Sequence, residues 1–428
     1  MEHNVEEVTL NSGAKGLLIN IPGSNVVNTK IYFRAGYQFG DMSKYEAPHL
    51  IEHHVLNATK KFPKKNQIMT EFSANGAYNN AFTNHAFISY LAECAEFEIE
   101  RILELMTEAV ARPLFPEEYY LTERENVRTE LTRYLSDYAR QVNVLASEAS
   151  HPKLVKNYQS RLEQLDSITH EDVTNHYRKT HTAANSNFVI TGAIENNREV
   201  IISKLNVLYD LLPYGERFEF IDEVGLGLKE PLVCVEEIDS IHFSLNWFQG
   251  EIDLKMRAAG NLLNTILTGG FGSRIFGKAR DEGLTYYLHS SQDATERTST
   301  LTMAGFCNRE KWRRLLEVIS SECLDIISHG PNIGELEAAK KRLIGGITVG
   351  SQTIGDISNW YSRDYVIEGT TLSYEEFFKL FNEISDDDII KVAEHYLSSS
   401  NHNATLVGNV KKTDADIVDV QLSDIWKS

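Results

Sequence analysis

Cysteines are sparse in this sequence, and none is placed to form a thiol motif. The 428 residues include four cysteines, which are far apart and contain no C-x-x-C pair: Cys94, Cys234, Cys307 and Cys323. This spacing argues against a thiol zinc site or a thiol redox centre. We expect four buried, reduced thiols.

Basic residues are outnumbered, and long apolar runs are missing. The chain has 42 lysines and arginines against 61 aspartates and glutamates, a formal net charge of −19. This charge disfavours nucleic acid and anionic membranes as partners. The first residues lack the basic segment and apolar core of a secretion signal, and no later stretch is apolar enough to span a bilayer. We predict a cytoplasmic protein that binds neither nucleic acid nor membrane.

The length of the chain predicts more than one folded unit. A chain of 428 residues suggests two to four units, and its apolar residues suffice for ordinary buried cores. Strand-like runs rich in β-branched and aromatic residues alternate with helical runs. In the first part of the chain, strands are expected near residues 8–10, 16–21, 29–36, 77–83 and 86–91, and a helix over 96–111.

The segment His49-Leu-Ile-Glu52-His53 contains candidate metal ligands, and other parts of the chain must supply the rest of the site. Residues four apart lie on one face of a helix, so His49 and His53 can offer imidazole nitrogens to one ion, with Glu52 beside them. Pro48 favours a helix that begins here, because proline suits the first helical position. The order H-x-x-E-H is the inverted form of the zinc hydrolase motif. A match of five residues also arises by chance, so a third ligand is needed.

A second helix, predicted to begin at Pro116, supplies candidates for the third ligand. It carries Glu123 and Glu130, which are seven residues apart and therefore share a face two turns long. Either carboxylate could point at the histidine pair. Glutamates on a helix face are otherwise usually solvated.

The second half of the chain resembles a diverged copy of the first. Residues 168–192 align without a gap on residues 384–408, and both segments have the pattern of helix, turn, strand and glycine. In the second copy Asn261 and Thr265 stand in place of the histidines, and Gly345 stands in place of Glu130. Only the first copy is therefore predicted to bind metal.

A stretch with linker composition, between Pro213 and Pro231, separates the two copies. We predict three segments along the chain. They are an N-terminal zinc-binding catalytic domain (1–215), a linker (216–231) and a C-terminal homologous domain without metal ligands that contributes substrate-binding residues (232–428).

These motifs resemble the pitrilysin and insulinase family of inverted-motif zinc metallopeptidases, which includes the mitochondrial processing peptidases. In that family two glutamates seven apart follow H-x-x-E-H, and the family spacing falls on Glu123 and Glu130 without adjustment. The resemblance covers nearly the whole chain, with its duplication and linker. It implies an α+β fold of two homologous halves, each a mostly antiparallel β-sheet packed against helices, which face each other across a substrate chamber.

The resemblance also implies a role for each residue of the first site. His49, His53 and Glu130 would bind one Zn²⁺ per chain and leave the fourth position open for catalysis. Glu52 would be the general base. Glu123 would orient a histidine from outside the ligand set.

Members of this family bind the substrate as an added β-strand, beside an Asn-Ala motif downstream of the zinc helix. The segment Asn80-Ala81-Phe82-Thr83 matches that motif, and it makes Asn80, Ala81 and Thr83 the predicted substrate-binding residues. An asparagine at a turn or strand end is the alternative for Asn80. The sequence departs from the family at Ala86, where many members have glutamate.

A segment of the second copy resembles the family's other hallmark, an arginine and a tyrosine seven apart that reach the substrate and the developing oxyanion. Arg280 lies six residues before Tyr286 and seven before Tyr287. The Gly-Leu-Thr-Tyr context favours Tyr286, whereas strict spacing favours Tyr287. We assign Arg280 and Tyr286 to the catalytic groups, with a core-packed aromatic as the alternative for the tyrosine.

The sequence therefore predicts a zinc endopeptidase that cleaves peptides or small unfolded proteins, and that works as a homodimer or as a heterodimer with a related subunit. One alternative is a non-catalytic or regulatory subunit of a heterodimeric peptidase, but such subunits usually lose motif residues. A peptide-binding scaffold with structural zinc is another, but it would need a fourth protein ligand. Strand addition depends on backbone pairing and leaves little side-chain signature of the natural peptide.

Overall fold

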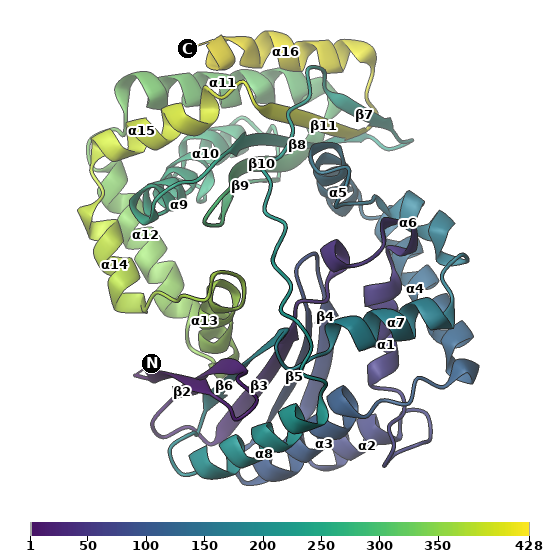
Figure 1. Ribbon diagram of the computed structural model, residues 1–428. Coiled ribbons are helices and arrows are strands. Elements are labelled where there is room, and N and C mark those ends of the chain that lie inside the picture. The colour runs from purple at the N-terminus through teal and green to yellow at the C-terminus, as the bar shows by residue number, and fades with distance from the viewer. Residues whose placement is uncertain (1, 428) are drawn as a thin grey trace. The chain divides into compact units, whose positions relative to one another are not determined.

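The computed structural model describes residues 2–427, and the chain divides into two compact units (Figure 1). The first unit comprises Met1–Thr132, Gln159–Ile221 and Gly350–Thr371. The second comprises Arg133–Tyr158, Asp222–Val349 and Leu372–Ser428. The boundaries at residues 215 and 232 stay a prediction about the order of the copies along the chain. By packing, Gly350–Thr371 from the second half belongs to the first unit, and Arg133–Tyr158 from the first half belongs to the second.

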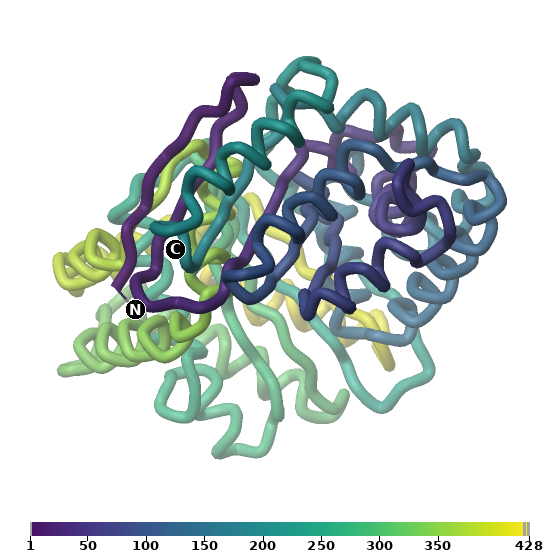
Figure 2. The backbone as a smooth tube through the Cα atoms, turned by 90° about the horizontal axis from the view of Figure 1, so that it is seen from below, coloured from purple at the N-terminus to yellow at the C-terminus, as the bar shows by residue number. Residues whose placement is uncertain are grey.

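The first unit is built on a six-stranded sheet. Its strands are β1 (Asn4–Thr9), β2 (Lys15–Asn20), β3 (Val26–Phe33), β4 (Tyr78–Thr83), β5 (Ile88–Ala95) and β6 (Ser186–Gly192). They lie in the order β1-β2-β6-β3-β5-β4, and only β2 and β6 are parallel neighbours. The purple hairpin of β1 and β2 forms one edge (Figure 2), and β4 forms the other.

Helices cover the two faces of this sheet unequally. The helices of the unit are α1 (Ala47–Val55), α2 (Gln67–Ala74), α3 (Ile99–Ala111), α4 (Glu117–Leu135), α6 (Tyr158–Leu165), α7 (His170–Thr180), α8 (Arg198–Leu211) and α13 (Ile354–Glu368). Helices α3 and α8 lie side by side along one face (Figures 1 and 2). Helix α13, from the second half of the sequence, packs on β3 and β6.

The burial of the strands follows this coverage. Strand β6 is buried at every position, as expected for a strand covered on both faces. In β5, buried and half-buried residues alternate, because α13 leaves one of its faces partly open. The sheet therefore keeps an accessible face beside its β4 edge.

The second unit repeats this design with five strands. They are β7 (Leu232–Val235), β8 (Ser240–Gln249), β9 (Tyr287–Ala294), β10 (Ser299–Asn308) and β11 (His402–Gly408), in the order β7-β11-β8-β10-β9. Only β7 and β11 are parallel neighbours. This is the order and direction of β2-β6-β3-β5-β4, so the predicted α+β fold with two homologous, mostly antiparallel halves is confirmed.

The helices of the second unit include one from the first half of the sequence. They are α5 (Tyr138–Ser150), α9 (Leu254–Thr268), α10 (Arg274–Asp281), α11 (Trp312–His329), α12 (Glu335–Gly350), α14 (Tyr374–Glu383), α15 (Asp386–Leu397) and α16 (Lys412–Lys427). Helix α5 packs on β8 and β11, which is the counterpart of α13 on β3 and β6.

The aligned segments of the two copies fold alike. Thr169 and Ser385 each close a capping box that starts a helix, α7 in one copy and α15 in the other. The strands that follow end at Gly192 and Gly408, whose φ angles are +130° and +133°. A Cβ on Gly192 would lie 2.0 Å from a backbone oxygen, that of Val26. The glycine is therefore required both by its dihedral angle and by the close approach of the neighbouring strand.

Gly192→Ala is expected to destabilise the protein by more than the roughly 1–2 kcal/mol that a positive φ alone costs an alanine. The carbonyl of Val26 would also have to move away from the new methyl group. Urea denaturation of the variant would measure the loss. Gly13→Ala is the matched control, because Gly13 has a φ of +83° but open space around its Cβ position. Equal losses for the two variants would contradict the steric explanation.

All four cysteines are free, and three are buried, but Cys234 is only half-buried, because it lies on the short edge strand β7. Within residues 2–427, no helix combines the length and the apolar character needed to cross a membrane.

Candidate metal centre

Helix α1 presents the two histidines of the inverted motif. It begins at Ala47, with Pro48 in its first turn as the sequence predicts, and Glu46 occupies the N-cap position. His49 and His53 are one turn apart, and their ring centroids are separated by 4.9 Å. Their Nε2 atoms are therefore available to a common partner.

That partner is Glu130, on helix α4. Its Oε2 lies 3.5 Å from Nε2 of His49 and 3.7 Å from Nε2 of His53. Ligand atoms about 2.0–2.2 Å from a tetrahedral zinc ion are roughly 3.3–3.5 Å from one another. The three donor atoms thus have the chemistry and nearly the spacing of a zinc ligand set. The structure brings together the three residues that the sequence predicts as ligands.

Glu52 lies beside the histidines. Among residues 2–427, His49, Glu52 and His53 form a group whose ligand atoms all lie within 4.8 Å of one another. Burial raises the pKa of the Glu52 carboxyl, and the neighbouring His49 opposes that rise. A carboxylate that is partly shielded from water and close to the metal position is suited to accept a proton.

Glu123 contacts the other ring nitrogen of His53. Its Oε2 lies 3.5 Å from His53 Nδ1 and accepts a hydrogen bond of 2.9 Å from Asn126, and Oε1 lies 2.8 Å from Lys65 Nζ. Burial raises the pKa of this carboxyl, but His53, Lys65 and Asn126 together hold it well below its usual range. Glu123 is therefore an ionised group that lies beside Nδ1 of His53, and not beside the Nε2 atom that faces Glu130. That it orients His53 stays a prediction.

His49 has a carboxylate partner that the sequence reasoning missed. Its Nδ1 lies 2.9 Å from Oε2 of Glu46, and Arg161 Nε donates to the other oxygen of the same carboxylate. Glu46 is completely buried. A glutamate three residues before a helical histidine is a usable local signal. The contribution of Arg161, 115 residues away, has no signal in the sequence.

Negative charge surrounds both imidazoles. Burial lowers the pKa of His49, but hydrogen bonds to Glu130 and Glu46 outweigh burial and raise this pKa to about 9. Burial raises the pKa of Glu46, but Arg161 and His49 outweigh it and lower this pKa to about 2. The site therefore favours a cation between its ligand atoms.

The predicted substrate-binding residues lie on β4, an edge strand that contacts α1. Asn80 is exposed, Ala81 is buried and Thr83 is half-buried. The side chain of Asn80 accepts a hydrogen bond of 2.9 Å from the N–H of Ala81, which also fits the alternative of a purely structural asparagine. The edge itself offers backbone groups to another strand.

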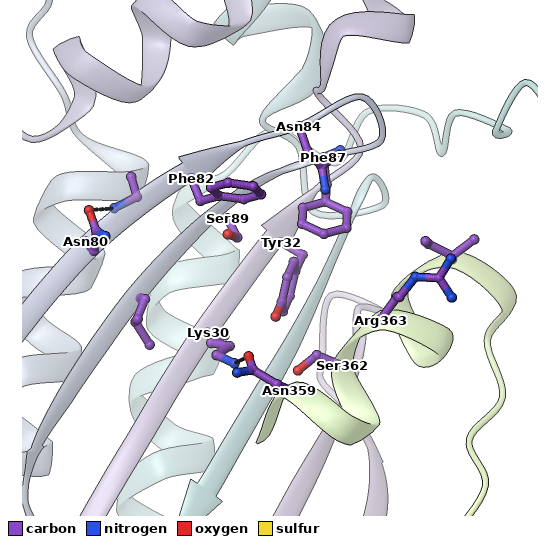
Figure 3. Close-up of a pocket in the computed structure, with 13 residues that line it drawn as sticks. Lys30, Tyr32, Asn80, Phe82, Asn84, Phe87, Ser89, Asn359, Ser362 and Arg363 are labelled. Atoms are coloured by element: carbon purple, nitrogen blue, oxygen red, sulfur yellow. Dashed lines mark hydrogen bonds between the residues drawn. The ribbon is translucent and has the colours of Figure 1, made fainter. Parts of the chain in front are cut away.

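A cavity of about 400 Å³ lies on the accessible face of the sheet, next to β4 (Figure 3). Tyr32 and Phe82 line it from β3 and β4, and Phe87 lines it from the turn between β4 and β5. Helix α13 contributes Asn359, Ser362 and Arg363. Lys30, on β3, lies beside α13, and its ammonium group donates to the side chain of Asn359. Because side chains alternate along a strand, Asn80 and Phe82 share the face of β4 that borders this cavity.

Arg280 and Tyr286 lie in the second unit and contact each other. The guanidinium carbon of Arg280, on α10, is 4.2 Å from the ring centroid of Tyr286. Tyr286 is 76% exposed, so it is not the core-packed aromatic of the alternative interpretation. The ring of Tyr287 instead lies 5.2 Å from that of His289. The structure therefore pairs Arg280 with the tyrosine that the sequence context favours.

The positions that replace the ligands in the second copy bond to their own helix. Asn261 donates to the carbonyl of Arg257, and Thr265 donates to the carbonyl of Asn261. Across residues 2–427, the one cluster of three metal-ligating side chains is that on α1. The second copy thus keeps the fold without the donor atoms.

Two copies of one α+β unit, one of which carries a histidine–histidine–carboxylate cluster suited to zinc, define a class of two-repeat, metallopeptidase-like proteins. Residues 16–166 match the family described as Insulinase (Peptidase family M16), and residues 167–343 match the Peptidase M16 inactive domain. The chain belongs to the insulinase family, peptidase family M16.

Relatives of known name are distant but nearly as long as this chain. A protein of Rickettsia felis named "Uncharacterized zinc protease" is 22% identical over 96% of this chain and 99% of its own length. A protein of Dictyostelium discoideum named "Mitochondrial-processing peptidase subunit beta" is 21% identical over 85% of this chain and 80% of its own length.

Solved structures share the fold. A peptidase M16 inactive domain from Pseudomonas fluorescens superposes with a TM-score of 0.83 at 18% identity, covering 95% of this chain and 98% of that chain. A protease from Helicobacter pylori gives a TM-score of 0.82 at 16% identity, covering 95% and 100%. At these identities, the structures support the fold alone.

Proposed function

We propose that this protein is a zinc-dependent peptidase that hydrolyses peptides or small unfolded proteins bound as an added β-strand. The observation that carries the proposal is the approach of His49 Nε2 and His53 Nε2 to Glu130 Oε2, at 3.5 and 3.7 Å, with Glu52 adjacent. The names of several relatives, which include the term zinc protease, support the same activity.

His49, His53 and Glu130 would hold one zinc ion per chain. When bound, the ion would act as a Lewis acid that makes water a better nucleophile and polarises the peptide carbonyl. Glu52 accepts the proton of the water that attacks the carbonyl carbon, and it passes this proton to the nitrogen of the leaving amine. Glu123 holds His53 in the orientation that the reaction needs.

The edge of β4 is the proposed binding place for the substrate backbone. A peptide added to this edge would pair through main-chain hydrogen bonds beside Asn80, Ala81 and Thr83. Alternate side chains of the peptide would then face the cavity that Phe82 borders, and the others would face α1. Main-chain pairing of this kind accepts peptides with different side chains.

Two further features of the proposal come from the family resemblance, and a third comes from the sequence composition. Arg280 and Tyr286 are proposed to contact the substrate carbonyl and the developing oxyanion. The chain is proposed to act as a homodimer or with a related subunit, which the name of the Dictyostelium relative, a peptidase subunit, supports. The cytoplasmic location stays a prediction from the sequence.

The test is made on the purified wild-type protein. We expect about one zinc ion per chain, and cleavage of a quenched fluorescent peptide that a chelator abolishes and added zinc restores. Cleavage that continues after complete removal of metal would refute the mechanism. If the wild type binds zinc but does not cleave the peptide, either alone or with a co-purified related subunit, the result would instead support a non-catalytic role.

A further inference from the structure

We propose that Glu46 is a positioning residue for His49, and that Arg161 in turn holds Glu46 in place. This inference rests on the proposed zinc function and concerns a residue outside the inverted motif. Its basis is a chain of three buried groups, all in the first unit, that ends on one of the proposed ligands.

The first link is the hydrogen bond between His49 and Glu46. A carboxylate only accepts hydrogen bonds, so at 2.9 Å the N–H of His49 Nδ1 donates to Glu46 Oε2. In the neutral imidazole, the form that can bind a metal, this bond selects the tautomer in which Nε2 carries the lone pair. Nε2 is the nitrogen that lies 3.5 Å from Glu130. Glu46 thereby fixes both the tautomer and the ring plane of His49 in the orientation that a metal requires.

The second link is Arg161, on α6, which is itself buried. Its Nε donates to Glu46 Oε1, and its Nη2 donates to the hydroxyl of Tyr37 at 2.9 Å. The guanidinium lies 4.9 Å from the ring centroid of Tyr37 and 5.4 Å from that of Tyr45. The two rings stack on each other, so the arginine has one tightly defined position.

The position of Glu46 argues that the contact is selected and not incidental. Glu46 is the N-cap residue of α1, yet its side chain makes no capping bond. In the copy without ligands, Asp253 is the N-cap of α9 and accepts the usual hydrogen bond, from Met256 N. A fully buried carboxylate is costly unless it is paired. In α1 the N-cap carboxylate instead binds a ligand histidine.

The experiment measures zinc affinity by competition with a chelator of known strength, at one pH. Glu46→Gln keeps the shape of the side chain but loses the charge, and it presents an amide to Arg161. We expect zinc to bind about 10–100-fold more weakly, and the visible absorption of the Co²⁺-substituted protein to change. Glu108→Gln is the matched control, because it removes another buried carboxylate that is paired with an arginine, Arg112, at 2.7 Å. The control should bind zinc as the wild type does.

A double variant covers the case in which Glu46→Gln fails to fold because Arg161 has lost its carboxylate partner. In Glu46→Met/Arg161→Met, both charges are replaced by apolar side chains, a change that proteins generally tolerate. The loss of zinc affinity should persist in this folded double variant. Wild-type zinc affinity in either variant would overturn the positioning role while leaving the peptidase proposal intact. A wild type that binds no zinc would overturn both.

Discussion

Glutamine in place of Glu52 is expected to lower kcat for peptide cleavage by about 10²–10⁴-fold, the range that a general acid–base group contributes. The amide has the shape of the carboxylate but cannot take a proton from water at neutral pH. Because His49, His53 and Glu130 remain, the variant should keep the zinc content of the wild type. Metal analysis and steady-state cleavage of a quenched peptide, made on the same preparation, would measure both quantities.

Glu125→Gln is the control for Glu52→Gln. Glu125 lies on α4 near the same site, but its side chain is exposed and pairs with Arg128. Its replacement should leave both kcat and zinc content unchanged. If Glu52→Gln cleaved peptide at the wild-type rate, Glu52 could not be the base.

Glu130→Gln is expected to weaken zinc binding by more than the roughly 10–100-fold that loss of an outer-shell group costs. The substitution removes the negative charge and the strongest oxygen donor from a site with three protein ligands. Cleavage should fall in parallel when zinc is limiting and recover in part when zinc is added. Chelator competition gives the affinity, and titration of activity with zinc gives the recovery.

Glu123→Gln separates a ligand from an orienting residue. Glu123 contacts Nδ1 of His53, whereas Glu130 contacts Nε2 of both histidines. We therefore expect a smaller loss of zinc affinity for Glu123→Gln than for Glu130→Gln. The reverse order would show that Glu123 binds the ion and would overturn the assignment of the third ligand.

Local spacing made much of the candidate metal centre predictable. The four-residue interval between His49 and His53 places two imidazoles on one helical face, and Pro48 marks where that helix starts. The seven-residue interval between Glu123 and Glu130 likewise restricts them to one face of α4. Both are properties of a single helix, so they can be inferred before any packing is known.

The orienting contacts were less accessible to sequence reasoning. That Glu123 rather than Glu130 contacts Nδ1 of His53 depends on how α4 packs beside α1. The Glu46–Arg161 pair joins residues 115 apart, and nothing local distinguishes Arg161 from the other arginines of the chain. Contacts of this kind form only when distant helices dock.

The sequence also did not predict that each half of the chain contributes one helix to the sheet of the other half. The duplication predicted two similar sheets, and the strand orders agree with it. Helix α5 nevertheless packs on the sheet of the second unit, and α13 packs on that of the first. The apolar face of a helix predicts that the helix packs on a sheet, but not on which of two similar sheets it packs. The open face of β5, and with it the cavity beside β4, results from where α13 lies.

The sequence by itself determined which candidate donor atoms share a helical face, because their intervals along single helices follow from the order of the residues. It also determined the repeat and the copy that carries the candidate ligands. Only the tertiary structure decided which carboxylate faces which imidazole nitrogen, and that Arg161 pairs with Glu46. These contacts join segments that are distant in sequence, and their geometry follows from the packing of whole helices and not from any local preference.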